Sequence, residues 1–508
     1  MSNRTFPYQI HISSQGKLLV EADRFDIPRH QITFLFGESG IGKSIISKAI
    51  YGLLDPQELD VVVNGIPYEA YLKTRHVVDM QADGFFVFQE PSSHLNPLMK
   101  LQDQLREGTL AQARTEPDIL SQLWETTRGT GIKELLRVYP QPHRPSGGEK
   151  QRFLLAMAFK KIELYIIHAS PSEQTMFVFD EPTGSLDNET RNLFLALLFN
   201  QFRRRPFTTL LITHDYSMIS EVFKFHTDLV DSIVFKELTL KKNRLQLNEF
   251  SPESYLKWIK KNQDSPSSHK ARKSRRSPKD ILLRLESGIS VFGRRLILSR
   301  YARSKNASPL IIRRHQIVYL NAPSGVGKTT LAKLIMGLMR GQNFDMHLGE
   351  IHLTDATPTQ FWQQLWGRKM GMVFQHADEA LNLNARVKDI FAGLPYPEHI
   401  TSDYVHRKLE EHFPLEVDYS FLNRPIKYLS GGQKQRLNLL RTLSLDTELL
   451  ILDEPLNGLD FVSIKKMIDL LLTKQEEGKG ILLISHNEEI FDSLGTADRV
   501  YLRAEGEW

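Results

Sequence analysis

The chain contains no cysteine among its 508 residues, and it has no long uncharged apolar run. The lack of cysteine excludes disulfides, iron–sulfur clusters and thiolate zinc sites. A membrane-spanning helix needs about 18 or more consecutive apolar residues, and no such stretch exists. The first residues also lack the basic region and apolar core of a secretory signal. These absences predict a cytoplasmic location.

The excess of positive over negative charge is small as well, because the chain has 65 basic and 60 acidic residues and a net charge of +5. So balanced a chain is not expected to bind nucleic acid through its overall charge. The local exception is residues 263–280, which are basic, contain serine and proline, and have almost no apolar side chains. We predict a flexible linker there, between a first domain at 1–262 and a second at 281–508. Contact of this segment with anionic lipid head groups or RNA is the alternative.

Five landmarks occur twice in the same order, at nearly constant spacing. The offsets between the copies are 285 for Lys43 and Lys328, 286 for Gln89 and Gln375, 284 for Ser146 and Ser430, 273 for Asp180 and Asp453, and 272 for His214 and His486. Such a long internal period predicts two copies of one domain. The fall from 284 to 273 places an 11-residue insertion in the first copy, which we assign to 160–174.

The first landmark in each copy is a glycine-rich loop between a hydrophobic strand and a helix. Its backbone N–H groups and the helix start suit a polyphosphate, the lysine suits the β and γ phosphates, and the serine or threonine suits Mg²⁺. A glycine turn that binds no ligand would explain the glycines, but neither the Lys-Ser pair nor the Lys-Thr pair. The candidate residues are Gly37, Glu38, Ser39, Gly40, Ile41, Gly42, Lys43 and Ser44, and Ala322, Pro323, Ser324, Gly325, Val326, Gly327, Lys328, Thr329 and Thr330.

Paired acids end an apolar strand in each copy, at Asp180-Glu181 and Asp453-Glu454. The first acid of each pair is predicted to hold Mg²⁺ and the second to activate the attacking water. His214 and His486, at the ends of later strands, are predicted to contact the γ-phosphate. Gln89 and Gln375 are predicted to contact Mg²⁺ and the water. A lone histidine or glutamine at such a place is more often structural. Only the occurrence of these residues in both copies favours a functional role for them.

The order of glycine loop, glutamine, SGG(E/Q)KQR, Asp-Glu, Leu-Asp and histidine resembles the nucleotide-binding domain of the ATP-binding cassette (ABC) family. The resemblance implies an α/β fold of two tandem P-loop ATPase domains, each with a mostly parallel RecA-like core sheet, an antiparallel β part and a helical subdomain. It also implies that ATP is held between the glycine loop of one domain and the SGG motif of the other. The SGG residues are Ser146, Gly147, Gly148 and Glu149, and Ser430, Gly431, Gly432 and Gln433.

A finer resemblance concerns the residues after each glutamine. Leu95-Asn96-Pro97 and Leu381-Asn382-Leu383 are similar to a stretch of the oligopeptide, dipeptide and nickel importer ATPases. This resemblance implies an ATPase subunit that drives uptake of peptide, peptide-like metallophore or nickel. It further implies two integral-membrane permease subunits, which we expect to be non-identical, an indirect solute-binding protein, and a peripheral position on the cytoplasmic face of the inner membrane.

Three departures from the family pattern fall near one pair of motifs. Ala322 replaces the first loop glycine, Pro145 replaces the leucine before the first SGG, and the approach from Tyr139 to Ser146 is long. They suggest that the two ATP sites are unequal, with equivalent sites as the alternative. An aromatic residue that could stack on adenine is present in the second copy, at Phe292, but the first copy has Ser14-Gln15 there.

Other functions compatible with two cassettes are a soluble ATPase acting on ribosomes or DNA, an importer motor for a vitamin or metal outside the peptide group, and a silent scaffold. The short linker and the lack of cysteine disfavour the first. The Leu-Asn-Pro stretch disfavours the second. Both copies keep the lysine, the acid pair and the histidine, which disfavours the third.

Overall fold

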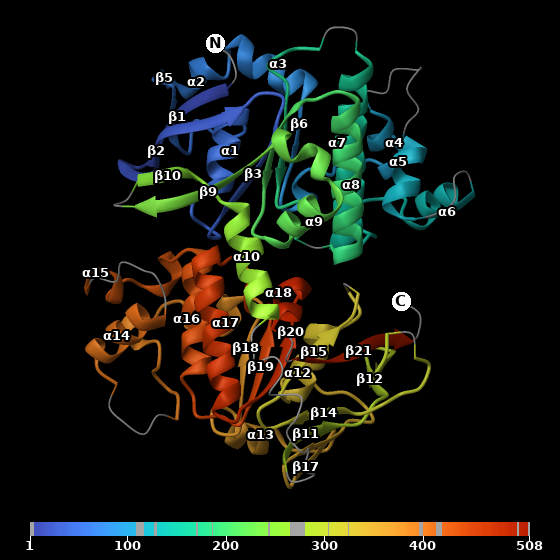
Figure 1. Cartoon of the computed structure of the whole chain (residues 1–508), viewed down its shortest axis with the longest axis vertical. Helices are drawn as coiled ribbons and strands as arrows, with labels where there is room; N and C mark the ends of the chain where they lie inside the picture. Colours follow the sequence, from blue (N-terminus) through green and yellow to red (C-terminus); the bar gives the residue numbers. More distant parts are fainter. Residues whose placement is uncertain are drawn as a thin grey trace. The chain divides into compact units, whose positions relative to one another are not determined.

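The computed structural model describes residues 5–107, 116–125, 130–168, 171–184, 186–241, 244–264, 280–302, 304–323, 325–395, 400–412, 419–494 and 497–505. It contains two compact units, Met1–Tyr255 and Leu256–Trp508, which are described separately (Figure 1). Most of the predicted linker, 265–279, lies outside the described residues. Within the described part, no helix is long and apolar enough to cross a membrane.

The elements of the first unit alternate between strands and helices. In chain order they are β1 (Thr5–Ser14), β2 (Lys17–Pro28), β3 (Ile32–Gly37), α1 (Lys43–Tyr51), β4 (Asp60–Val63), β5 (Ile66–Pro67), α2 (Tyr68–Tyr71), α3 (Arg75–Asp83), β6 (Phe85–Val87), η1 (Pro91–Ser93), α4 (Leu101–Arg106), α5 (Glu116–Leu123), α6 (Thr130–Val138), α7 (Gly147–Ile167), β7 (Met176–Asp180), α8 (Asn188–Arg204), β8 (Thr208–Ile212), α9 (Ser217–Phe225), η2 (Thr227–Ser232), β9 (Ile233–Lys241), β10 (Arg244–Glu249) and α10 (Pro252–Gln263), which crosses into the second unit.

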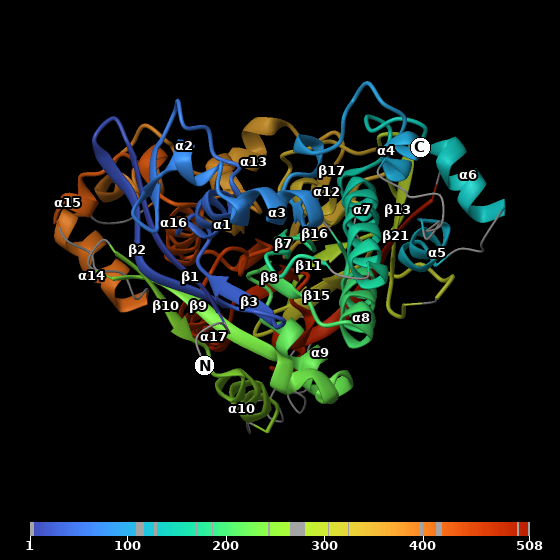
Figure 2. The ribbon, with the colours of Figure 1, turned by 90° about the horizontal axis from the view of Figure 1, so that it is seen from above.

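The core sheet of the first unit has the order β10-β9-β3-β8-β7-β6 and is parallel except for β10. Its central strands β3, β8 and β7 are buried on both faces, so they read as nearly continuous apolar runs, whereas the edge strand β10 is largely exposed. Side chains nevertheless alternate between the faces. Leu35 and Val178 join the cluster formed with α1, α3 and the antiparallel sheet β2-β1-β4-β5. Phe179, on the opposite face, packs on Phe159 of α7 and Phe194 of α8, two helices that lie side by side in Figure 2.

The second unit repeats this plan. Its elements are β11 (Ile281–Leu285), β12 (Ile289–Val291), β13 (Arg294–Ser299), β14 (Leu310–Arg313), β15 (Ile317–Asn321), α12 (Lys328–Ile335), β16 (Asp345–Leu348), β17 (Ile351–Thr354), α13 (Thr359–Leu365), β18 (Met370–Val373), η4 (Ala377–Glu379), η5 (Val387–Asp389), α14 (Ser402–His412), α15 (Tyr419–Leu422), η6 (Ile426–Tyr428), α16 (Gly431–Leu443), β19 (Leu449–Asp453), α17 (Phe461–Glu476), β20 (Gly480–Ile484), α18 (Glu488–Ser493) and β21 (Ala497–Glu505). The predicted fold class is therefore confirmed.

The two core sheets differ at one edge. In the first unit β10 pairs with β9, and the β1–β2 hairpin belongs to the separate antiparallel sheet. In the second unit β13 pairs with β21, so the hairpin β12–β13 continues the core sheet in the order β12-β13-β21-β15-β20-β19-β18. The hairpin that precedes the glycine loop is thus supported differently in the two units.

The insertion in the first copy lengthens a helix. The helix α7, which follows the first SGG motif, has 21 residues, whereas its counterpart α16 has 13. Its added turns carry apolar side chains that are buried, including Ile162 and Tyr165, and Tyr165 packs against Phe177 of β7. The extra residues therefore enlarge the core of the first unit.

An ion pair in the first unit joins α8 to the loop after β8. Arg191 contacts Asp215 at 2.8 Å, and both side chains are largely buried. Burial alone would raise the pKa of Asp215, but Arg191, Ser217 and His214 together outweigh it and lower this pKa. The corresponding positions of the second unit are Ile464 and Asn487, so the same place there carries no charge.

We expect Arg191→Ala to lower the free energy of unfolding of the first unit by on the order of 3 kcal/mol, because it leaves a buried carboxylate without its arginine partner. The matched control is Arg191→Ile with Asp215→Asn, which installs the residues of the second unit and should cost clearly less. Scanning calorimetry of the full chain measures both. A double variant as unstable as Arg191→Ala would contradict this account of the pair.

Candidate functional site

Each glycine loop connects the end of a core strand to the start of a helix, at Lys43 for α1 and Lys328 for α12. Gly40 and Gly325 have φ of 78° and 79°, and Gly42 and Gly327 have φ of 121° and 110°. These values lie in the region that favours glycine. The two glycines of each loop therefore have closely similar conformations, and a glycine loop of this kind can form a nest of N–H groups suited to phosphate. Ser324, a predicted member, lies outside the described residues.

Both loop lysines fold back onto their own loops. Lys43 Nζ donates to the carbonyl oxygens of Gly37 and Glu38 at 2.6 and 2.8 Å. Lys328 Nζ donates to those of Ala322 and Pro323 at 2.8 and 3.4 Å. Burial lowers the pKa of Lys43. An anionic phosphate is a stronger partner for an ammonium than a carbonyl, so each loop holds a cation ready for exchange.

The loops differ at their first residue. Gly37 has φ of 141°, and a Cβ there would lie 2.6 Å from the carbonyl oxygen of Leu238. The second loop has Ala322 at this place, and among its described residues only Gly325 and Gly327 have positive φ. The second loop thus accommodates the methyl group by an ordinary backbone conformation, which the sequence alone did not indicate.

The predicted water-activating glutamates share an unusual backbone conformation. Glu181 has φ of 47° and Glu454 has φ of 48°, which non-glycine residues rarely adopt. The N–H of Glu181 donates to the carbonyl of Ile212 at 3.0 Å, and that of Glu454 donates to Ile484 at 2.8 Å. Each glutamate is therefore held at the end of its strand by the neighbouring strand. Strained conformations of this kind cluster at active sites.

In the first unit, Glu181 collects the predicted histidine and glutamine around its carboxylate. Gln89 Nε2 donates to Oε2 at 3.0 Å, and His214 Nδ1 lies 3.4 Å from Oε1. Burial alone would raise the pKa of Glu181, but His214 and Lys43 outweigh it and lower the pKa to about 2. The Glu181 carboxylate in turn raises the pKa of His214, although burial opposes this.

In the second unit, Glu454 is held by different partners. Its Oε2 accepts from the Ser485 hydroxyl and from the His486 N–H, each at 3.2 Å, and His486 Nε2 lies 3.4 Å from Oε1. Burial raises the pKa of Glu454. Gln375 is turned to the glycine loop, where its Oε1 accepts from Thr329 at 3.4 Å. The same residue types thus meet in both units with different hydrogen bonds.

The predicted Mg²⁺ ligands lie close together and fit a hard cation. Ser44 donates to Asp180 at 3.0 Å, and burial raises the pKa of Asp180 to about 6. Both carboxylate oxygens of Asp453 are buried and make no hydrogen bond within the described residues, and burial raises its pKa. Buried carboxylates with few donors, beside a hydroxyl and an amide oxygen, are the environment that a divalent cation compensates.

Each SGG motif begins a separate helix, α7 or α16. Ser146 and Ser430 are N-caps in capping boxes closed by Glu149 and Gln433. Glu149 also accepts a short hydrogen bond from the Tyr139 hydroxyl. This bond connects the start of the long segment before the first motif to the motif itself. Gly147 and Gly431, the first residues of these helices, are exposed, and the first N–H groups of a helix have no acceptor within it.

A lysine after each SGG motif was not singled out from the sequence. Lys150 donates to the Ser92 hydroxyl at 3.3 Å, and Lys434 contacts Asp378 at 2.9 Å. Ser92 and Asp378 each follow the predicted glutamine by three residues. These contacts link the SGG helix to the segment that follows the glutamine. The equal offsets were visible in the repeat, but only the fold brings the partners together.

The hairpin turn before each glycine loop also differs. In the second unit Phe292, with 81% of its surface exposed, lies at the tip of β12–β13. It lines a hollow of about 190 Å³ together with Arg294 and the loop residues Gly325, Val326, Gly327 and Thr330. In the first unit the corresponding turn residue is Gln15, with φ of 51° like Phe292. The first unit therefore presents an amide where the second presents an aromatic ring.

Comparison with known proteins places both copies in one family. The ABC transporter family model matches residues 20–184 and 306–457, more than half of the chain. A peptidoglycan transport ATP-binding protein of Agrobacterium fabrum (YejF) is 26% identical over 99% of this chain and 91% of its own length. A putative HMP/thiamine import ATP-binding protein of Bacillus subtilis (YkoD) is 24% identical over 92% of this chain and 84% of its own. A nickel import ATP-binding protein of Lactiplantibacillus plantarum (LarO) is 34% identical over 37% of this chain and 77% of its own.

Among solved structures, an RNase-L inhibitor covers 97% of this chain with 90% of its own, at a TM-score of 0.59 and 15% identity. At that identity the likeness shows the fold alone. The family match rests on the segments that hold both glycine loops, both SGG motifs and both acid pairs. The chain therefore belongs to the ABC transporter family, as an ATP-binding protein with two tandem ATPase domains that bind and hydrolyse ATP with Mg²⁺ as the usual cofactor.

Proposed function

We propose that the chain is the motor subunit of an ABC importer and hydrolyses ATP at two composite sites to drive uptake through separate permease subunits. One observation carries the proposal. In each unit a glutamate with positive φ lies beside a histidine, at the strand end next to a loop lysine and a buried aspartate. A scaffold that only bound nucleotide would not need this arrangement twice.

In the proposed reaction the loop N–H groups and Lys43 or Lys328 bind the ATP phosphates. Ser44, Asp180 and Gln89 would hold Mg²⁺ in the first unit, and Thr329, Asp453 and Gln375 in the second; bound there, Mg²⁺ neutralises charge on the β and γ phosphates. The lysines reach the phosphates by exchanging their carbonyl partners, as ammonium–phosphate bonds are stronger.

The attacking water is proposed to lose its proton to Glu181 or Glu454. His214 and His486 contact these carboxylates and can hold them in place while reaching toward the γ-phosphate. A carboxylate is effective as a base only within hydrogen-bond reach of the water, so its orientation matters as much as its pKa. The strained backbone of each glutamate fixes that orientation.

Adenine is proposed to stack on Phe292 in the second unit, where the exposed ring borders the loop hollow. Gln15 provides no such ring in the first unit. The two nucleotide sites would therefore bind the base with different strength. This is a further difference between the sites, beside the departures from the family pattern at Ala322 and Pro145.

The proposed cargo is a peptide, a peptide-like metallophore or nickel, on the resemblance at Leu95-Asn96-Pro97. The relatives are named for peptidoglycan, HMP/thiamine and nickel transport, so membership of the family fits several cargoes. The proposed partners are two non-identical permease subunits, with a solute-binding protein acting through them. The chain would then lie on the cytoplasmic face of the membrane. A soluble ATPase acting on ribosomes or DNA, or a motor for another vitamin or metal, is the competing function.

Replacing both bases should separate binding from turnover. We expect Glu181→Gln with Glu454→Gln to lower ATP hydrolysis by about 100-fold or more, the usual contribution of a general base, while ATP stays bound. Phosphate release and retention of labelled ATP measure the two effects. The control, Lys43→Ala with Lys328→Ala, should lose binding itself. Near-normal hydrolysis by the double glutamine variant would refute the assigned base.

The first loop should reject a methyl group that the second tolerates. Gly37→Ala combines a left-handed φ with a 2.6 Å approach to a carbonyl. Such strain of about 1–3 kcal/mol should weaken ATP binding at this loop roughly tenfold. The measurement uses a fluorescent ATP analogue with Lys328→Ala, so that only the first loop binds. Ala322→Gly, with Lys43→Ala, is the control and should change affinity little. Equal losses in both would contradict the difference between the loops.

Copurification tests the partners. Affinity-tagged chain, expressed in its native host and extracted in mild detergent, should bring down two different integral-membrane proteins in equal amounts. ATPase activity should rise when they are reconstituted with the chain. Cosedimentation with ribosomes or tight DNA binding, without any membrane protein, would instead favour the competing function.

A further inference from the structure

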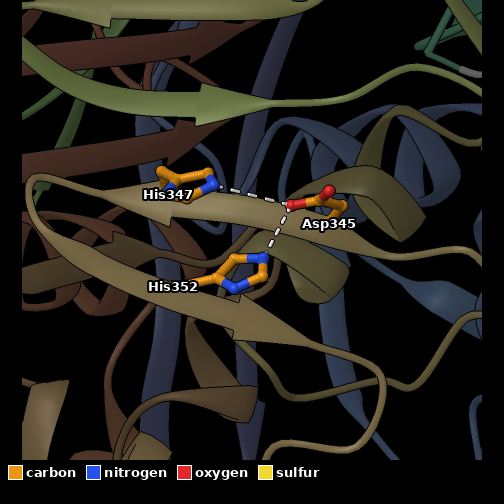
Figure 3. A group of neighbouring side chains, drawn as sticks. All are labelled: Asp345, His347 and His352. Carbon is orange, nitrogen blue, oxygen red and sulfur yellow. Dashed lines mark hydrogen bonds and ion pairs between the residues drawn. The ribbon is translucent and has the colours of Figure 1, made fainter.

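Three possible metal ligands meet on the surface of the second unit, on the hairpin β16–β17 (Figure 3). They are Asp345 and His347 of β16 and His352 of β17. None belongs to the glycine loops, the acid pairs or the SGG motifs. The cluster therefore has no part in the ATP chemistry proposed above.

The strand register puts all three side chains on one face. His347 and His352 are direct cross-strand partners, and Asp345 precedes His347 by two residues. Met346, Leu348 and Leu353 alternate with them and are buried in the core of the unit. Because side chains alternate along a strand, burying these apolar residues requires the ligands to face solvent. The hydrophobic core thus fixes the orientation of the ligands.

The ligand atoms already lie at distances suited to one ion. Asp345 Oδ1 lies 3.0 Å from His352 Nε2 and 3.8 Å from His347 Nε2, and the group spans no more than 4.8 Å. A tetrahedral ion with bonds of about 2.0–2.1 Å keeps its ligand atoms about 3.4 Å apart. The imidazole rings are stacked, 4.5 Å apart and at 10°, so both present the same edge to the carboxylate (Figure 3). Small side-chain rotations would complete the site.

A positive charge on the neighbouring strand is compensated. Arg284 of β11 lies opposite His347 in the sheet, on the same face. Its Nε donates to Glu286 at 2.7 Å, so it forms an ion pair with that carboxylate. A cation at the histidine cluster would therefore meet one carboxylate ligand and a neutralised neighbour. Two imidazoles and one carboxylate favour Zn²⁺ and similar ions over Mg²⁺.

We propose that Asp345, His347 and His352 form a surface site for a divalent metal ion of intermediate softness, for which Zn²⁺ is the probe. With three protein ligands, an ion there keeps at least one coordination position open to water or to a donor from another molecule. The exposed position of both histidines gives an ion direct access from solvent.

The first unit supplies a natural negative control. Its equivalent hairpin β4–β5 has Asp60 at the aspartate position, and the cross-strand pair Val62 and Pro67 where the second unit has two histidines. The backbone register is the same around both turns. Only the second unit therefore carries a cross-strand pair of histidines on this hairpin, whereas the first unit has a single histidine, His11 of β1, opposite Val62. The first unit can be used to test whether the pair suffices.

The experiment is calorimetric titration of the full, nucleotide-free chain, without a histidine tag, with Zn²⁺ alone and with Mg²⁺ alone. We expect one Zn²⁺ per chain at this site. His347→Gln and His352→Gln should each weaken binding by more than 10-fold, since losing even a group that only hydrogen-bonds to a metal ligand costs about 10–100-fold. His11→Gln, which changes an exposed histidine of β1, should leave binding unchanged. Co²⁺ in place of Zn²⁺ should give a visible absorption band that both cluster variants lose.

The gain-of-site variant makes the test independent of damage to the second unit. In the His11→Gln background, which removes the histidine opposite Val62, Val62→His with Pro67→His builds the same ligand set beside Asp60 and should raise the stoichiometry from one ion to two. The proposal is overturned if His347→Gln and His352→Gln bind Zn²⁺ as wild type does. It is equally overturned if Mg²⁺ binds at these residues as tightly as Zn²⁺. Either result leaves the ATPase proposal intact, because that rests on other residues.

Discussion

The ATP sites depend on one hydrogen bond that occurs twice. A glutamate N–H, just past the end of a core strand, donates to the last carbonyl of the adjacent strand, from Glu181 to Ile212 and from Glu454 to Ile484. In both units this bond occurs together with a positive φ at the glutamate and with a carboxylate that contacts the histidine of the next strand end. A parallel sheet is required for it, because only parallel strands bring their carboxyl ends to the same edge. The helices and the antiparallel sheet serve to bury that sheet on both faces.

Equal motifs in the two units have acquired unequal surroundings. Glu181 and Glu454 each contact an imidazole, but Glu181 also accepts from an amide, whereas Glu454 accepts from a hydroxyl and a backbone N–H. Gly37 is confined by a carbonyl, whereas Ala322 has room for its methyl group. The hairpin tip bears Gln15 in one unit and Phe292 in the other. Two domains in one chain can diverge in this way, since each copy must fit only its own neighbours.

Much of the fold was predictable because the signals were strong and repeated. Continuous apolar runs before the glycine loop, the acid pair and the histidine predicted β3, β7 and β8, and the structure confirms them with shifts of about one residue at some ends. The different pairing of the two hairpins was not predictable. Which strand pairs with the edge of a core sheet depends on strands that are far away in the sequence. The cluster at His347 was missed for a related reason: its histidines are five residues apart, and they meet only when the turn sets the register.

The sequence by itself determined the family and the doubled domain, and it predicted which groups would bind and hydrolyse ATP. Those features follow from residue types at fixed short spacings, which survive in any correct fold. Tertiary structure alone decided the orientation of each carboxylate, the partners of Glu181 and Glu454, and the contacts of Lys150 and Lys434. These depend on distances between segments far apart in the chain. Such distances are fixed by the packing of the whole unit, and local sequence carries little information about them.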